Sequence, residues 1–415
     1  MRASQSVWLL SVLTLMAWAV QAQVRDVMPT VTVRAPNRAY HNAVVSVVLP
    51  PAVERHVVLH ETDALFLEAP GEKPALPCQI EREGQQPRLT FLLPDLPKGA
   101  KRVYHLRRAP RDYRPTQAVS VTQQAEDLEI RVGGKLFARY TTQSGPNKPF
   151  FYPILTPEGA NITRRWPMEQ TTGESHDHPH HRGLWFTHGS VNGIDFWSEG
   201  KGTGKTVNKA FQALTSGPVY GGFRAATEWR APDDRLIATD TRQVAIIPLP
   251  NGDRLLDFTI VITPADGPLV FGDTKEGMFG LRLADALAPA RKQGGHIKTS
   301  TGNEDAAAWG KPAEWVDDWG PIQNQTYGVA IFDAPDNLRH PQTWHARDYG
   351  LFCVNPFGLH DFGLGAKGAG DYTVPAGKSL TLRYRLLFHK GDTISAGVAE
   401  QYAQFADPPQ VEAKW

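Results

Sequence analysis

Leu380-Thr-Leu-Arg-Tyr-Arg-Leu-Leu-Phe-His389 decides the fold class of this chain. Apolar side chains occupy every second position of this stretch, at Leu380, Leu382, Tyr384, Leu386 and Phe388. A period of two predicts a β-strand, and mostly polar residues in between predict that its second face is wet. We therefore expect antiparallel sheets that bury one face of each strand.

Similar patterns extend along the chain in both directions. Residues 256–262 alternate in the same way, and the runs 128–132 and 136–140 flank a Gly-Gly turn, which predicts a hairpin. Short strands are also predicted at 30–34, 44–49, 57–59, 89–93 and 103–106. The one persuasive helix is at 394–405, where four apolar side chains share a side, at Ile394, Val398, Tyr402 and Phe405.

The 415 residues exceed what one hydrophobic core usually serves, so we expect two domains. Residues 23–112 are predicted to form a small immunoglobulin-like β-sandwich. The two prolines within Ala109–Pro115 indicate a linker, which we place at 113–125. Residues 126–415 are then a large β-rich domain that ends in the helix and carries the catalytic or binding residues.

Residues 1–22 have the pattern of a secretory signal peptide: a basic start, an apolar run at 7–20, and small residues before the cleavage point. The mature protein is therefore expected in the periplasm or outside the cell, with no membrane span after signal removal. A formal charge of +1 gives no electrostatic reason to expect nucleic acid as a partner. Cys78 and Cys353 could pair, or could remain free buried thiols.

The polar stretch Glu174-Ser-His-Asp-His-Pro-His-His-Arg-Gly-Leu-Trp-Phe-Thr-His-Gly189 holds five of the fourteen histidines. Extended backbone before Pro179 would place His176, His178 and His180 on one side, with Asp177 and His181 on the other. Imidazoles serve as metal ligands or as proton carriers. The stretch therefore predicts a divalent-metal site at 176–181 or acid–base chemistry; the alternative is a loop held by backbone hydrogen bonds.

Three further polar clusters follow. In Asp273–Arg282, Glu276 is a candidate base or metal ligand tuned by Lys275 or Arg282, although the Lys275–Glu276 pair could be a plain surface ion pair. Lys311–Gly320 contains two tryptophans, which could stack a sugar ring or fill the core. Pro341–Gly350 combines five functional side chains, those of Trp344, His345, Arg347, Asp348 and Tyr349. The motif Asn355-Pro-Phe-Gly358 follows this segment.

The runs H-D-H-P-H-H-R-G-L-W, K-E-G-M-F-G-L-R, G-K-P-A-E-W-V-D and W-H-A-R-D-Y-G-L-F, with N-P-F-G, resemble the bacterial PmoA-type family of unknown function over roughly 127–407. That family is similar to the galactose-mutarotase-like group of sugar epimerases, hydrolases and lyases. The resemblance implies an antiparallel β-supersandwich for the large domain. It also implies an acid role for His180 or His181 and a base role for Glu276.

We therefore predict an exported carbohydrate-active enzyme, a lyase, hydrolase or epimerase, that acts by His/Glu acid–base chemistry on a sugar or sugar acid. Two alternatives are a non-catalytic glycan-binding protein and a metal-dependent oxidoreductase. The candidate catalytic residues are His180, His181, Glu276 and His345. The candidate substrate-binding residues are His178, Arg182, Trp185, His188, Lys275, Arg282, Trp315, Trp344, Arg347 and Asp348.

Overall fold

The computed structural model describes residues 28–50, 64–71, 74–83, 86–109, 118–142 and 147–414. They form two compact units, one of residues 1–114 with 409–415 and one of residues 115–408. Of the described residues, 51% are in strands and 5% in helices, which confirms the predicted all-β class. The signal peptide predicted at 1–22 and the strand predicted at 57–59 lie outside the described residues.

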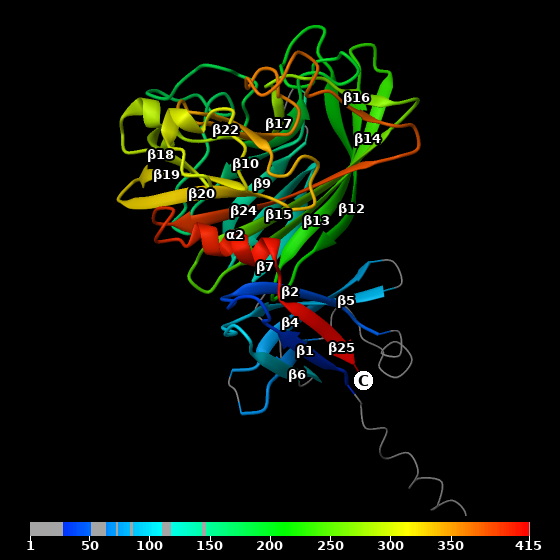
Figure 1. Cartoon of the computed structure of the whole chain (residues 1–415), viewed down its shortest axis with the longest axis vertical. Coiled ribbons are helices and arrows are strands. Elements are labelled where there is room, and N and C mark those ends of the chain that lie inside the picture. The colour runs from blue at the N-terminus through cyan, green and yellow to red at the C-terminus, as the bar shows by residue number, and fades with distance from the viewer. Residues whose placement is uncertain are drawn as a thin grey trace, which may run out of the picture. The chain divides into compact units, whose positions relative to one another are not determined.

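The first unit is a seven-stranded antiparallel sheet in the order β2-β5-β4-β3-β6-β1-β25 (Figure 1). Alternate side chains of the strands, such as Val31 and Val33, fill one core. The expected β-sandwich thus takes the form of one continuous sheet. Its strands are β1 (Thr30–Arg34), β2 (Ala43–Val48), β3 (Leu65–Glu68), β4 (Leu76–Glu83), β5 (Gln86–Leu93), β6 (Lys101–Arg108) and β25 (Gln410–Lys414).

Two parts of the chain differ from the predicted domain limits. β25 pairs with β1, with Val33 opposite Val411, so the last residues complete the first unit and are not part of the large domain. Residues 113–117 of the predicted linker lie outside the described residues, but its second half forms β7 (Val119–Gln124). Val119 and Val121 are buried in the core of the second unit, which explains why this segment is a strand.

The second unit is built on two eight-stranded antiparallel sheets. The first has the order β21-β22-β17-β11-β10-β9-β8-β7. Its strands after β7 are β8 (Asp127–Val132), β9 (Lys135–Thr141), β10 (Phe150–Ile154), β11 (Leu184–His188), β17 (Gly277–Arg282), β21 (Thr343–Arg347) and β22 (Leu351–Asn355). The predicted Gly-Gly hairpin is confirmed as β8–β9.

The second sheet has the order β12-β13-β14-β15-β24-β20-β19-β18. Its strands are β12 (Lys205–Thr215), β13 (Gly221–Arg230), β14 (Leu236–Pro248), β15 (Arg254–Pro264), β18 (His296–Thr299), β19 (Trp315–Ile322), β20 (Gln325–Asp333) and β24 (Leu380–Lys390). β16 (Leu269–Phe271) pairs with β23 (Tyr372–Val374). Short 3-10 helices are η1 (Asp285–Leu287), η2 (Pro289–Arg291) and η3 (Asp305–Ala308).

The main core lies between the two eight-stranded sheets. It receives the alternating side chains of β24 that the sequence predicted, together with inward side chains of β11, β17 and β22. The opposite face of the first sheet, which we call the outer face, carries a smaller apolar cluster that includes Phe150, Trp185, Trp197 and Cys353. Alternation along each strand therefore gives this sheet a second, separate surface on which other side chains gather.

The predicted helix is α2 (Val398–Ala406), shorter than expected. Tyr402 and Phe405 contact Phe332 of β20, so the helix packs beside the second sheet (Figure 1). Ile394 is 82% exposed and does not belong to the packed side, because the Asp392 carboxylate accepts from the backbone of Ser395 and forms a turn before the helix. In the described part of the chain, no helix is long and apolar enough to cross a bilayer.

Candidate active site

A buried arginine shapes the histidine-rich loop that precedes β11. The Arg164 guanidinium is inaccessible to solvent and donates to the backbone carbonyls of Asp177 at 2.8 Å, His178 at 2.9 Å and His181 at 3.3 Å. Because these three carbonyls converge on one planar group, the loop holds a single compact conformation. The sequence interpretation did not identify this role for Arg164.

Asp177 lies between Arg164 and Arg282 of β17. Its Oδ1 accepts a hydrogen bond from Arg164 Nη1 and another, at 2.7 Å, from Arg282 Nη2. Burial acts to raise the pKa of Asp177, but the charges of Arg282 and Arg164 outweigh burial and hold that pKa below its usual value. The carboxylate is therefore charged and fixes the loop to the sheet.

Four rings form a continuous stack on the outer face. Ring centroids are 5.2 Å apart from Tyr349 to His178, 4.7 Å from His178 to His181, and 5.4 Å from His181 to Trp185. His180 packs edge-on against His181, with centroids 4.4 Å apart. The loop thereby brings three of its histidines together with a residue from the fourth sequence cluster.

The predicted separation of His178 from His181 is wrong. His178 has a left-handed backbone with φ of 44°, and the amide of His181 donates to the His178 carbonyl at 3.0 Å. This turn replaces the extended backbone expected before Pro179. His176 lies apart from the stack, since its ring packs on Trp166 and its Nε2 contacts the Thr171 carbonyl at 3.1 Å.

The residues of the histidine stretch do not fit a metal site. The rings of His178 and His181 are parallel to within 4°, so their nitrogens do not point to a shared position. Among the residues that the structure describes, no group of three or more His, Cys, Asp or Glu side chains is arranged to hold a metal ion. We therefore derive no step that passes through a metal at 176–181.

His181 and His180 differ in access. His181 is buried, and neither of its ring nitrogens has a hydrogen-bond partner. Burial, with the charges of His180 and Arg282, lowers the pKa of His181 well below its usual value. Both ring nitrogens of His181 are inaccessible and unpartnered, so His181 is a stacking residue here; His345 is also buried, but its Nε2 is not among these inaccessible, unpartnered atoms. His180 is half-buried, and burial followed by the charge of Lys148 lowers its pKa to about 4.

A buried ion-pair network supports Trp185 and Trp197. Lys148 Nζ lies 3.1 Å from a Glu199 carboxylate oxygen and 5.8 Å from the centre of the Trp185 ring. Arg182 binds the same carboxylate through Nε at 2.9 Å and Nη2 at 3.0 Å. Arg182, predicted to contact substrate, thus uses its guanidinium to hold Glu199.

Glu276 lies immediately before β17 and pairs with Lys275, whose Nζ is 2.9 Å from Oε1. Burial is the main cause that raises the pKa values of Tyr349 and Cys353, and the charge of Glu276 acts in the same direction on both. Asn355 Nδ2 donates to the carbonyls of Thr274 at 2.9 Å and Lys275 at 3.0 Å. The N-P-F-G motif therefore positions the segment that carries Glu276.

His345 on β21 is held in one tautomer. Its Nδ1 lies 2.8 Å from the Lys275 carbonyl, and because a carbonyl accepts only, Nδ1 carries the proton. Burial, partly opposed by this hydrogen bond, lowers the pKa of His345 to about 3. The ring is therefore neutral at physiological pH, and its Nε2 has a free lone pair. Its ring packs edge-on to Trp309, with centroids 4.8 Å apart.

Arg347 shares the outer face with His345, two residues away on the same strand. Its guanidinium carbon lies 4.7 Å from the centre of the Trp309 ring and 5.3 Å from that of Tyr349. The candidate site therefore combines His178, His180, Glu276, Lys275, His345 and Arg347 with flat aromatic residues. Trp309 was not identified from the sequence; an aromatic residue directly before the G-K-P-A-E-W-V-D run was the available signal.

Four predicted site residues lie elsewhere. Trp344 is buried in the core between the sheets, where its Nε1 donates to the Ala313 carbonyl at 2.9 Å. His188 is buried on the core side of β11 and donates through Nε2 to the Gly272 carbonyl at 2.7 Å. Trp315 begins β19 of the other sheet. Asp348 lies in the turn between β21 and β22, and no contact of its carboxylate with the candidate site is seen.

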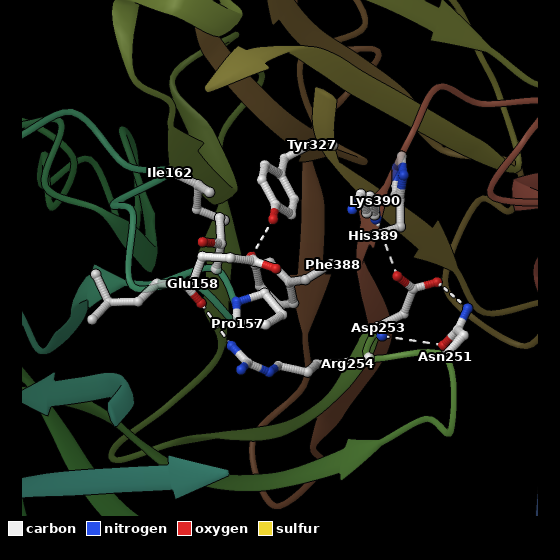
Figure 2. A pocket seen from close by; sticks show the side chains of 14 residues that line it. Pro157, Glu158, Ile162, Asn251, Asp253, Arg254, Tyr327, Phe388, His389 and Lys390 are labelled. Carbon is white, nitrogen blue, oxygen red and sulfur yellow. Dashed lines mark hydrogen bonds between the residues drawn. The ribbon is translucent and has the colours of Figure 1, made fainter. Parts of the chain in front are cut away.

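A cavity of about 150 Å³ elsewhere in the second unit is an alternative site (Figure 2). Its polar groups are largely used within the protein. The Tyr327 hydroxyl donates to Glu158, Arg254 donates to a main-chain carbonyl at 2.7 Å, and Asp253 accepts from Asn251 at 2.7 Å. The outer face, by contrast, presents the Arg347 guanidinium with ring contacts but no ion pair among the described residues, so we consider it the better candidate.

The thiols of Cys78 and Cys353 are both free and buried. Cys78 lies in β4 of the first unit and Cys353 in β22 of the second. Burial raises the pKa of each thiol above its usual value. Both cysteines therefore act as small apolar core residues.

Solved structures to which the chain shows similarity include a protein in glycosyl hydrolase family 38 from Enterococcus faecalis and an alpha-mannosidase from the same species. Their identities to this chain are 12% and 13%, each with a TM-score of 0.40. The matches cover 94% and 95% of this chain but 48% and 46% of those proteins, so the chain spans about half their length. No curated protein matches the chain.

The sequence itself gives the more direct relationship. Residues 127–404 match the model of a family of unknown function, DUF6807. The matched region begins with β8 and ends within α2, so it contains the histidine loop, Glu276, His345 and Arg347. This chain belongs to the DUF6807 family.

Proposed function

We propose that this protein is an exported carbohydrate-active enzyme that moves protons on a sugar or sugar acid at the outer face. The observation that carries the proposal is the fixed tautomer of the His345 ring. One nitrogen of this ring is fixed by the Lys275 carbonyl and the other holds a free lone pair, in the neighbourhood of the segment that carries Glu276. A neutral imidazole with a fixed tautomer can accept a hydrogen bond from a bound hydroxyl at Nε2, which would position that hydroxyl for proton transfer to Glu276.

The protonation states favour different roles from those first expected. His180 and His345 are unprotonated near neutral pH, because burial lowers their pKa values to about 4 and about 3. Each can therefore act as an acid only after it has accepted a proton. We propose Glu276 as the proton acceptor, with His345 and His180 as neutral hydrogen-bond acceptors that position the substrate.

Flat aromatic rings support a carbohydrate as the substrate. Trp309 is partly exposed beside His345, and Tyr349 is partly exposed at the end of the ring stack. Sugar rings bind well to such faces while their hydroxyls reach nearby polar groups. The PmoA-type resemblance and its galactose-mutarotase-like relatives are part of this proposal, with lyase, hydrolase and epimerase as the reaction classes.

The proposal is tested with Glu276→Gln and a matched control. Glu304→Gln removes a carboxylate that pairs with Lys298 at 3.2 Å, an ion pair of the same kind away from the outer face. Turnover would be measured on a panel of neutral and uronic-acid-containing oligosaccharides by product analysis. We expect Glu276→Gln to lower kcat by roughly a hundredfold or more while Glu304→Gln retains it.

Full activity in Glu276→Gln would remove the base assignment. A wild-type protein that binds oligosaccharides from the panel without converting any of them would favour the glycan-binding alternative. Melting temperatures of both variants within a few degrees of the wild type would show that lost turnover is not lost folding.

A further inference from the structure

Arg347 differs from the other cationic side chains around the candidate site. Within the described ranges, each of its cationic neighbours has a carboxylate partner: Arg164 and Arg282 with Asp177, Arg182 and Lys148 with Glu199, and Lys275 with Glu276. Arg347 makes ring contacts but no ion pair with any described residue. A cation is thus presented on the outer face without its counter-charge.

The position of Arg347 is set by its neighbours rather than by an acid. The guanidinium carbon lies over Trp309 at 4.7 Å and over Tyr349 at 5.3 Å from the ring centres. Cation–π contacts hold the guanidinium plane and leave its N–H edge available. A fork of N–H donors held in this way matches the two oxygens of a carboxylate.

The surroundings add positive charge. Arg282 is fully buried with its carbon 4.8 Å from the centre of the Tyr349 ring, and its Nε and Nη1 have no hydrogen-bond partner. Burial is the main cause that lowers the pKa of His345, and the charges of Arg347, Lys275 and His178 act in the same direction. The nearby carboxylates are Asp177, which Arg164 and Arg282 share, Glu199, which Arg182 and Lys148 share, Asp285, which pairs with Arg291, and Glu276, which pairs with Lys275. The outer face is therefore short of negative charge.

We propose that Arg347 binds the carboxylate of a uronic-acid residue, so that the substrate is an anionic glycan rather than a neutral one. This inference rests on the proposed function, because it assigns a substrate class to the same site. His345 lies two residues from Arg347 on the same face of β21, so a uronate held by Arg347 would have its ring beside the free His345 Nε2.

The test compares uronic-acid oligosaccharides with their carboxyl-reduced counterparts, which keep the same stereochemistry but lack the charge. Binding of glucuronate- and galacturonate-containing oligosaccharides would be measured by calorimetry for the wild type and three variants. Arg347→Gln removes the cation, and Arg347→Lys keeps the charge without the fork. Arg383→Gln is the control, because it removes an exposed arginine paired with Asp336 elsewhere in the same unit.

We expect at least one uronate to bind the wild type about tenfold or more tightly than its reduced counterpart, the factor for a charge-assisted hydrogen bond. Arg347→Gln should abolish that difference between uronate and reduced sugar, Arg347→Lys should retain part of it, and Arg383→Gln should retain all of it. The wild-type preference should also decrease with added salt. The comparison of a uronate with its reduced counterpart on the wild-type protein needs no variant, so it tests the proposal even if Arg347→Gln misfolds.

Two results separate this inference from the proposed function. If carboxyl-reduced sugars bind and are converted as well as uronates, the role of Arg347 is wrong and the proposed function stands. If no oligosaccharide of the panel binds or is converted, both are wrong. Tight binding of sulfated sugars together with no preference for uronates would overturn the assignment to a carboxylate.

Discussion

Replacing Asp177 by Asn should destabilise the second unit strongly, although Asp177 itself is partly exposed. The substitution keeps the shape of the side chain but removes the charge that Arg164 and Arg282 share. Both guanidiniums are inaccessible to solvent, so water cannot take over the role of the lost carboxylate charge. The perturbation therefore leaves two neighbouring buried cations that repel each other.

The magnitude follows from the burial of the three groups. Removing one partner of a fully buried ion pair costs about 3 to 5 kcal/mol. The Asp177 side chain is 38% exposed, so solvent screens part of its interaction and the estimate falls to about 2 to 3 kcal/mol. For a unit of this size we expect the melting temperature to drop by roughly 3 to 5 °C.

Thermal unfolding followed by circular dichroism measures this effect, with Asp336→Asn as the control. Asp336 also pairs with an arginine, but its side chain is 62% exposed, so its loss should cost less than about 1 kcal/mol. The pKa of Asp177 is lowered in the folded state, so its stabilisation is present above the unfolded value of about 3.9 and is lost as the pH falls through the folded value. Equal melting temperatures for Asp177→Asn and wild type at neutral pH would refute the reasoning.

Two further predictions concern packing and pH. Gly280→Ala would place a Cβ 2.8 Å from the Cys353 sulfur and 3.0 Å from the Trp185 ring, and both of these side chains are buried. The free energy of unfolding should therefore fall by about 1 to 3 kcal/mol, and an unchanged melting temperature would contradict this packing. Burial acts to lower the pKa of His389, but the Asp317 carboxylate, whose Oδ1 lies 2.9 Å from His389 Nε2, outweighs burial and raises that pKa. That stabilisation is full below the unfolded pKa of about 6.5 and is lost as the pH rises through the folded value, so the melting temperatures of His389→Gln and wild type should differ more at about pH 6 than at about pH 9. A difference that grows with pH would show that the sign is wrong.

Periodicity predicted the sheets because a strand that buries one face needs apolar residues at every second position. The alternation at 380–388 became β24, with its apolar positions in the main core, and the Gly-Gly signal became the β8–β9 hairpin. The same rule, applied to Trp344-His345-Ala346-Arg347, separates Trp344 from His345 and Arg347, as the structure does. The sequence analysis wrongly grouped Trp344 with His345 and Arg347 because they are close in sequence, without asking which face of the strand each would occupy.

The histidine loop could not be predicted from local pattern. Its conformation depends on Arg164, ten or more residues upstream, and on Arg282, about a hundred residues downstream. Contacts of such separation leave no periodic signal. The left-handed backbone at His178 follows from them, and a histidine in that conformation is uncommon enough that an extended backbone was the reasonable expectation.

The pairing of β25 with β1 affects how the chain must fold. Because the edge strand of the first unit is Gln410–Lys414, that unit cannot complete its sheet until this strand has been synthesised, after the whole of the second unit. Along the sequence, the second unit lies between the two stretches that make up the first unit, so it can fold before the first unit is complete. Removing the last few residues would therefore damage the unit encoded at the beginning of the sequence, and an excised second unit should be cut at both of its ends.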